Sequence, residues 1–451
     1  MTDRTVYRCE LAVLPDGEVA ADTVIEVAGG HFVRVEPGGT APADAEGLAG
    51  LVLPGAANAH SHAFHRALRG RTHGGRGSFW TWREQMYEVA NVLDPDTYRD
   101  LARAVFAEMT LAGFTAVGEF HYLHHRRDGR RYADPNEFGH ALVDAARDAG
   151  LRLTLLDTCY LAGGIGRDLA GAQERFGDGD AGSWAARVED LHRRYGDADD
   201  LVIGAAIHSV RAVPRDELPI VAAWASSHAT PLHVHVSEQP AENDACRAAY
   251  GVTPTQLLAD AGALGERTTA VHATHLTDRD ITVLGDSRTV ACLCPTTERD
   301  LADGVGPARR LLDAGCPLVL GTDSHAIVDA FEEARAVELD LRLATLERGH
   351  LSGHELLRGL TLDGQASLGF ADAGRLEVGA RADLVVVDLG SVRTAGTDAA
   401  HAIDAVVFGA AAADVTDVVV DGRRVVRDRS HAAGDVGRML HDAIAAVDRG
   451  S

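Results

Sequence analysis

The chain has 451 residues, of which 46% are hydrophobic and 24% are charged, the composition of an ordinary globular protein. Its formal net charge of −24 argues against nucleic acid as a partner, because such binding depends on Lys and Arg that neutralise phosphates. Every basic residue apart from histidine is an arginine, which rules out Schiff-base chemistry, a phosphate-binding P-loop and a metal pair bridged by a modified lysine.

Residues 1–5 lack the basic and then apolar order of a secretory signal peptide. No apolar run in the sequence reaches the roughly 18 residues of a membrane-spanning helix. We therefore expect a cytoplasmic protein with no membrane partner.

Short strand-like segments separated by turn residues occupy both ends of the chain. They lie at 7–14, 23–27 and 31–35, and again at 382–389, 405–408, 415–420 and 423–426, the last two joined by an Asp-Gly hairpin turn. Neither end has enough hairpins to bury a core alone. We predict that residues 1–55 and 375–451 pair into one small β-sandwich domain.

The middle of the chain, residues 56–374, alternates strand-length apolar runs with amphipathic helical patterns. The runs begin at 51–58 and recur at 115–120, 151–158, 201–208, 231–237, 268–274, 289–294 and 317–323. Helical patterns separate most of them, at 96–111, 137–149, 184–195, 217–227, 254–261, 307–314 and 329–347. Eight such strands predict an α/β fold of the (β/α)8 TIM-like barrel type. An open, doubly wound sheet is the alternative, but no G-x-G-x-x-G fingerprint supports dinucleotide binding.

His60 and His62 stand at the end of the first predicted barrel strand. Successive side chains of a strand point to opposite faces, so these two imidazoles fall on the same side. Neighbouring imidazoles suit a divalent metal of the zinc type, although an isolated His-x-His also fits two ordinary polar residues of a loop.

Titratable residues also stand at the ends of other predicted strands. In a barrel these ends form the catalytic face, so their convergence favours a catalytic site over scattered structural residues. The residues concerned are Glu119, His121 and Tyr122; His208 and Arg211; His233, His235 and Glu238; His272 and His275; and Asp323 and His325.

The segment from Pro54-Gly55 to His60-Ser61-His62, one histidine on each of strands 5 and 6, and Thr322-Asp323 on strand 8 resemble the amidohydrolase superfamily. Its members combine a metal-bearing (β/α)8 barrel with a small β-sandwich built from both chain ends. The absence of lysine fits the branch with one metal and no carboxylated-lysine bridge, which includes many deaminases.

Four motifs, at 60–64, 79–83, 119–122 and 235–239, are similar to those of the formimidoylglutamate deiminases of histidine degradation. The resemblance implies hydrolysis of N-formimino-L-glutamate to N-formyl-L-glutamate and ammonia, and by analogy a homodimer.

The same resemblance implies the roles of individual residues. The metal ligands would be His60, His62, His235 and Asp323, holding one Zn²⁺ per subunit, with Fe or Mn also compatible. Asp323 would also take a proton from the attacking water, Glu238 would carry a proton to the leaving amine, and His272 would stabilise the developing charge. We expect His233 to support the site or to pack in the core.

The implied substrate carries two carboxylates, which local cations must hold in so acidic a protein. The resemblance places this clamp on Arg83, Tyr122, His208 and Arg211. His65 stands where the family usually has Gln, so formimino-aspartate or another acidic amidine stays open as the substrate.

Two other functions also stay open. A deaminase of an amino-heterocycle such as guanine or cytosine predicts aromatic residues that stack on the substrate and no need for Arg83 and Arg211. A metal-stabilised binding protein predicts that loss of Glu238 or His272 leaves function intact.

Overall fold

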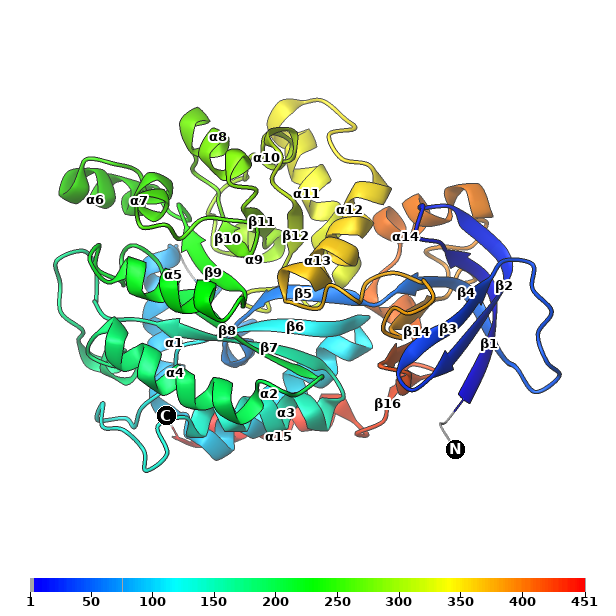
Figure 1. Cartoon of the computed structure of the whole chain (residues 1–451), viewed down its shortest axis with the longest axis horizontal. Coiled ribbons are helices and arrows are strands. Elements are labelled where there is room, and N and C mark those ends of the chain that lie inside the picture. Colours follow the sequence, from blue (N-terminus) through cyan, green and yellow to red (C-terminus); the bar gives the residue numbers. More distant parts are fainter. Residues whose placement is uncertain (1–3, 75, 451) are drawn as a thin grey trace.

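The computed structural model describes residues 4–74 and 76–450 and contains two eight-stranded sheets (Figure 1). One is an all-parallel barrel from the middle of the chain. The other is a mixed sheet that lies beside it, at the right of Figure 1, and is built from both chain ends.

The mixed sheet joins four N-terminal strands to four C-terminal ones. Its spatial order is β16 (Ser430–His431), β15 (Arg423–Arg427), β14 (Val415–Val420), β13 (Leu384–Val387), β4 (Glu46–Pro54), β1 (Arg4–Val13), β2 (Val19–Ala28) and β3 (His31–Glu36). Antiparallel pairing of β13 with β4 connects the two ends of the chain. The predicted pairing of the termini is confirmed, and so is the hairpin turn, where Asp421 and Gly422 both have positive φ.

The barrel strands follow one another in space in the order of the sequence. They are β5 (Ala56–Ser61), β6 (Phe114–His121), β7 (Arg152–Cys159), β8 (Leu201–Ile207), β9 (Leu232–Val236), β10 (Thr268–His272), β11 (Val290–Leu293) and β12 (Leu318–Leu320). A parallel bridge from Ser61 to Asp323 brings the segment after β12 back to β5. Gly321 permits this approach, because a Cβ there would lie 2.7 Å from the Cβ of His60. The barrel prediction is confirmed, and the open sheet is excluded.

Most of the helices follow barrel strands and cover the barrel, whereas the short helix at 399–401 contacts β2 of the mixed sheet. They are η1 (Ala63–Leu68), α1 (Phe79–Val92), α2 (Pro95–Leu111), α3 (Glu137–Ala149), η2 (Gly171–Arg175), α4 (Ala181–Tyr195), α5 (Leu218–Ser227), α6 (Pro240–Tyr250), α7 (Pro254–Asp260), α8 (Asp278–Asp286), α9 (Pro295–Asp300), α10 (Ala308–Ala314), α11 (Ala330–Thr345), α12 (Gly353–Leu360), α13 (Leu362–Ser367), η3 (Ala399–His401), α14 (Ala402–Gly409), η4 (Ala412–Asp414) and α15 (Val436–Gly450). None of these described helices is long and apolar enough to cross a membrane.

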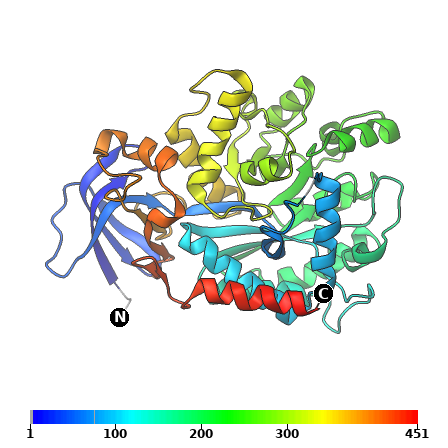
Figure 2. The ribbon, with the colours of Figure 1, turned by 180° about the vertical axis from the view of Figure 1, so that it is seen from behind.

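Helix ends follow the local sequence. Asp94 caps α2 by accepting a hydrogen bond from the backbone N–H of Thr97, and Pro95 occupies the first helical position. The last helix, α15, leaves the terminal sheet and packs along α2 on the outside of the barrel (Figure 2).

Two sequence-based predictions were wrong in detail. The run 51–58, predicted as one strand, is divided at Gly55 between β4 of the terminal sheet and β5 of the barrel. A side chain at Gly55 would meet Thr115 and Asp383, so the two sheets touch there. The segment 405–408, predicted as a strand, lies in α14, whose buried Ala402, Ile403, Val406 and Val407 follow the helical period.

One buried ion pair connects the two sheets. The guanidinium of Arg152 on β7 binds Asp383 just before β13, with Nη1 2.8 Å from Oδ1, and also reaches Asp421, with Nη1 3.0 Å from Oδ1. Arg152 and Asp383 are each only 1% exposed. The position of the terminal sheet on the barrel is therefore fixed partly by charge.

Candidate active site

A cavity of about 400 Å³ opens at the carboxyl ends of the barrel strands. The structure brings nearly all of the sequence-predicted site residues to it. Those lining the cavity are His62, His65, Arg83, Tyr122, His208, Arg211, His235, Glu238, His272 and Asp323. His60 lies directly behind His62 and His235 and is fully buried.

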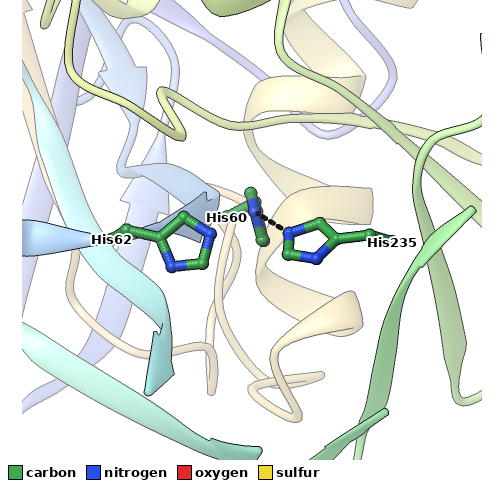
Figure 3. A group of neighbouring side chains, drawn as sticks. All are labelled: His60, His62 and His235. Atoms are coloured by element: carbon green, nitrogen blue, oxygen red, sulfur yellow. Dashed lines mark hydrogen bonds between the residues drawn. The ribbon is translucent and has the colours of Figure 1, made fainter. Parts of the chain in front are cut away.

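His60, His62 and His235 point toward one another from the ends of β5 and β9 (Figure 3). The Nε2 atoms of His60 and His235 are 3.1 Å apart. Oδ1 of Asp323 lies 3.4 Å from Nε2 of His60 and 3.5 Å from Nε2 of His62. The three imidazoles thus form one cluster, and the Asp323 carboxylate lies within 3.5 Å of two of them.

Backbone carbonyls orient two of these imidazoles. Nδ1 of His62 donates to the carbonyl oxygen of Phe120 at 2.9 Å, and Nδ1 of His235 donates to that of His208 at 2.8 Å. The Nε2 atoms of His62 and His235 therefore carry lone pairs, which face the space between the three histidines. Burial lowers the pKa of His62 to about 3 and that of His60 well below its usual value, so the rings are neutral, as metal ligands must be.

This donor set fits a divalent metal. Ligand atoms of a tetrahedral zinc about 2.0–2.1 Å from the ion lie roughly 3.3 Å from one another, close to the separations found here. Two lone pairs facing each other at 3.1 Å repel unless a cation or a proton lies between them. Support of metal-binding histidines by a carbonyl on the second nitrogen is also usual.

Glu119 on β6 holds the turn that carries His60 and His62. Its carboxylate accepts hydrogen bonds from the Ser61 hydroxyl at 2.5 Å, the backbone N–H of Ala63 at 2.7 Å and the Tyr98 hydroxyl at 3.1 Å. Burial raises the pKa of Glu119 to about 7. We infer that Glu119 is a structural support beneath the site.

Glu238, His272 and Asp323 form an acid–base group on one side of the converging donors. Nε2 of His272 lies 3.8 Å from Oε1 of Glu238 and 4.0 Å from Oδ2 of Asp323. Burial lowers the pKa of His272, but the carboxylates of Glu238, Glu298 and Asp323 outweigh burial and raise this pKa to about 10. His272 and Asp323 both have positive φ, the kind of backbone strain that gathers at functional sites.

The two predicted arginines of the clamp differ in their surroundings. Arg211 already has carboxylate partners, because Nη2 donates to Glu238 at 3.1 Å and Nε lies 3.4 Å from Glu242. Burial raises the pKa of Glu242 to about 6, against the opposing effect of Arg211. Arg83 stacks on the ring of Trp80 at 4.6 Å and makes no ion pair within residues 4–74 and 76–450.

His65 and two members of the predicted clamp, Tyr122 and His208, contact one another or the histidine cluster. Nε2 of His65 lies 3.0 Å from the hydroxyl of Tyr122. His208 packs against Tyr160 with ring centroids 4.4 Å apart, and its carbonyl oxygen orients His235. His65 and Tyr122 therefore form one wall of the cavity together.

His233 shares the inward face of β9 with His235 but lies deeper in the barrel. It is fully buried, and its Nε2 contacts the carbonyl oxygen of Ser367 at 3.4 Å. Burial lowers its pKa to about 4. His233 thus packs as a neutral residue inside the barrel.

A further buried cluster comprises His121, His124 and Asp157. The Asp157 carboxylate is already bound by Arg187, at 2.7 and 2.8 Å, and by the indole N–H of Trp184 at 3.0 Å. We interpret this cluster as a structural network between the barrel and α4.

Sequence reasoning did not single out several residues that the structure places at the site. They include Tyr87, Tyr160, Arg167, Glu242 and Glu298. Arg167, from the glycine-rich loop after β7, lines the cavity as an exposed guanidinium and has no ion pair with any described residue. Glu298 follows β11, a strand for which no catalytic or binding residue was predicted from the sequence.

The sequence profile of the amidohydrolase family matches residues 51–425. The chain belongs to the amidohydrolase family. This amidohydrolase is 39% identical to the formimidoylglutamate deiminase of Pseudomonas aeruginosa over 442 residues, which cover 94% of this chain and 95% of that protein.

Solved structures agree with the family. A crystal structure of an amidohydrolase from Brucella melitensis has a TM-score of 0.91 and 33% identity, covering 98% of this chain and 99% of that one. A zinc-bound adenosine deaminase from Xanthomonas campestris has a TM-score of 0.85 and 26% identity, covering 99% and 98%. The resemblance drawn from the sequence motifs is confirmed.

Proposed function

We propose that this amidohydrolase hydrolyses N-formimino-L-glutamate to N-formyl-L-glutamate and ammonia, a reaction of histidine degradation in the cytoplasm. The observation that carries the proposal is one cavity that joins the three-histidine cluster, with Asp323 beside it, to Arg83, a guanidinium without a carboxylate partner among the described residues. Such a cavity suits an anionic substrate with a hydrolysable C–N bond. The identity of 39% to a formimidoylglutamate deiminase supports it.

His60, His62, His235 and Asp323 would hold one Zn²⁺ per subunit, a choice supported by their donor types and by the zinc-bound relative. When bound, the ion lowers the pKa of water toward neutrality and so supplies the nucleophile. Metal analysis of the purified protein distinguishes zinc from iron and manganese. By family analogy we also expect a homodimer, which sedimentation analysis checks.

The side chains around the cavity divide the proton transfers. Asp323 takes the proton of the attacking water as oxygen adds to the formimino carbon, giving a tetrahedral intermediate. The proton on Asp323 and the hydroxyl proton of the intermediate are both delivered to the leaving nitrogen, with Glu238 as their carrier. The C–N bond breaks, ammonia leaves, and the carbon keeps oxygen as the formyl C=O. His272, charged beside these carboxylates, stabilises the negative charge that develops on oxygen.

Arg83, with Tyr122 and His208 beside it, would bind a substrate carboxylate, because its charge is not already neutralised within the described protein. Arg167 adds a second unpaired guanidinium to the same cavity. Arg211 stands between Glu238 and Glu242, so we propose that it orients Glu238 as well as facing the substrate.

One observation favours a second candidate, deamination of an amino-heterocycle. Aromatic side chains line the cavity, as that function predicts: Phe79, Trp80, Trp82, Tyr87, Tyr122 and Tyr160. Several of them already contact polar groups, however: Trp80 stacks on Arg83, and Trp82 packs on His65.

The experiment is ammonia release by the purified, metal-loaded protein from a panel of substrates. N-formimino-L-glutamate should react with the highest kcat/KM, ahead of formimino-aspartate, guanine, cytosine and 5′-methylthioadenosine. Preferential release from a heterocycle would replace the proposal with the second candidate. No release from any substrate would favour a binding protein.

A further inference from the structure

Glu298 stands behind the reaction site in α9, after β11. It is 5% exposed, and its Oε1 accepts the backbone N–H of Cys294 at 2.9 Å, so the carboxylate is fixed to the start of its own helix. The same oxygen lies 3.4 Å from Nδ1 of His272. Within the described chain, Glu298 is the carboxylate on the far side of that imidazole from the cavity.

His272 needs an external group to fix its orientation. Its backbone has φ of +68°, and Ala273 follows with φ of +49°, so the chain turns away immediately after β10. Its ring stacks on that of His235, with centroids 5.5 Å apart and an interplanar angle of 18°. This stacking sets the plane of the ring but does not determine which nitrogen faces the cavity.

We propose that Glu298 is a positioning residue that acts through His272. By accepting the hydrogen bond from Nδ1, its carboxylate fixes the rotation of the ring and directs Nε2 toward Glu238 and Asp323. A buried carboxylate that orients a histidine in this way is a recurrent device of enzymes. The inference rests on the proposed function only in that His272 takes part in turnover.

A purely structural role for Glu298 is the competing explanation, since its contact with Cys294 also holds the start of α9. Glu333 supplies a matched control. It is a second buried glutamate that anchors α9, accepting the N–H of Thr296 at 3.1 Å, and it has no contact with His272 among the interactions of the described chain. Substitution of Glu333 therefore perturbs the helix without touching the imidazole.

The test measures kcat, KM and metal content of zinc-loaded Glu298→Ala, Glu298→Gln and Glu333→Gln. Glu298→Ala should lower kcat by about 10- to 100-fold, with KM and metal content close to wild type. Glu298→Gln should lose less, because an amide oxygen still accepts the Nδ1–H bond, and Glu333→Gln should keep nearly full kcat.

A double-mutant cycle separates positioning from stability. In a His272→Ala background, Glu298→Ala should have no further effect on kcat. The proposal would be overturned if Glu298→Ala lowered kcat by the same factor in the wild-type and the His272→Ala backgrounds. It would also be overturned if Glu333→Gln lowered kcat as much as Glu298→Ala. Whether the wild type acts on N-formimino-L-glutamate is a separate result, because the cycle uses whichever substrate turns over.

One readout needs no turnover. In ¹⁵N NMR spectra of histidine-labelled, zinc-loaded protein, assigned by comparison with His272→Ala, Nδ1 of His272 should carry a proton in the wild type. Glu298→Ala should lose or shift that signal. An unchanged signal would contradict the proposal even if the protein released no ammonia.

Discussion

Replacement of Arg83 by Gln isolates the carboxylate-binding part of the site. The guanidinium lies over Trp80 and has no ion pair within the described chain, so its removal leaves no buried protein carboxylate without a partner. The substitution should therefore weaken substrate binding and leave the stability of the protein unchanged. A hydrogen bond to a charged group contributes about 1.5–3 kcal/mol, which corresponds to a rise in KM of roughly 10- to 150-fold.

The assay is ammonia release from three amidines: N-formimino-L-glutamate and two analogues, each lacking one of its carboxylates. If Arg83 binds one carboxylate, Arg83→Gln should lose kcat/KM with the full substrate and with only one analogue. Arg348→Gln, at an exposed arginine away from the cavity, should change none of the three rates. Equal losses on both analogues would refute the assignment of Arg83 to a single carboxylate.

Three further predictions concern buried titratable side chains. Arg211→Ala should lower kcat as well as raise KM, because it removes the counter-charge beside Glu238; an effect on KM alone would limit Arg211 to substrate binding. Burial lowers the pKa of His233 from 6.5 to about 4. Between these two pH values the unfolded chain binds a proton at His233 and the folded protein does not, so the free energy of unfolding falls as the pH drops from 6.5 to 4. His233→Leu should remove about 3 kcal/mol of that pH dependence, measured by urea unfolding between pH 7.5 and 4, and identical pH slopes in the two proteins would count against it. Asp383→Asn should cost about 3 kcal/mol of unfolding free energy by leaving Arg152 buried and under-compensated, and a change below about 1 kcal/mol would show that the remaining partners suffice.

Much of the fold was predictable because the barrel strands are buried on both faces and read as continuous apolar runs between amphipathic helices. The errors arose where periodicity carries little information. The run 51–58 is apolar on both sides of Gly55, so nothing in it marks the change from one sheet to the other. Residues 405–408 are a short apolar piece whose helical period appears only when Ala402 and Ile403 are included.

The site was predictable to the extent that its residues stand directly at strand ends. Glu298 was missed because it lies inside a short helix, where a glutamate resembles an ordinary first-turn residue. Glu242 resembles a solvated residue of α6, yet it is 1% exposed. Its contact with Arg211, and the contact of Arg211 with Glu238, depend on tertiary packing that one sequence does not reveal.

The most direct test of the central claim measures metal content and ammonia release on the same preparation. We expect about one zinc per chain, turnover of N-formimino-L-glutamate that disappears on chelation and returns with added zinc, and loss of both metal and turnover in His235→Ala. Undiminished ammonia release from metal-free protein, or none from fully zinc-loaded protein, would contradict the account.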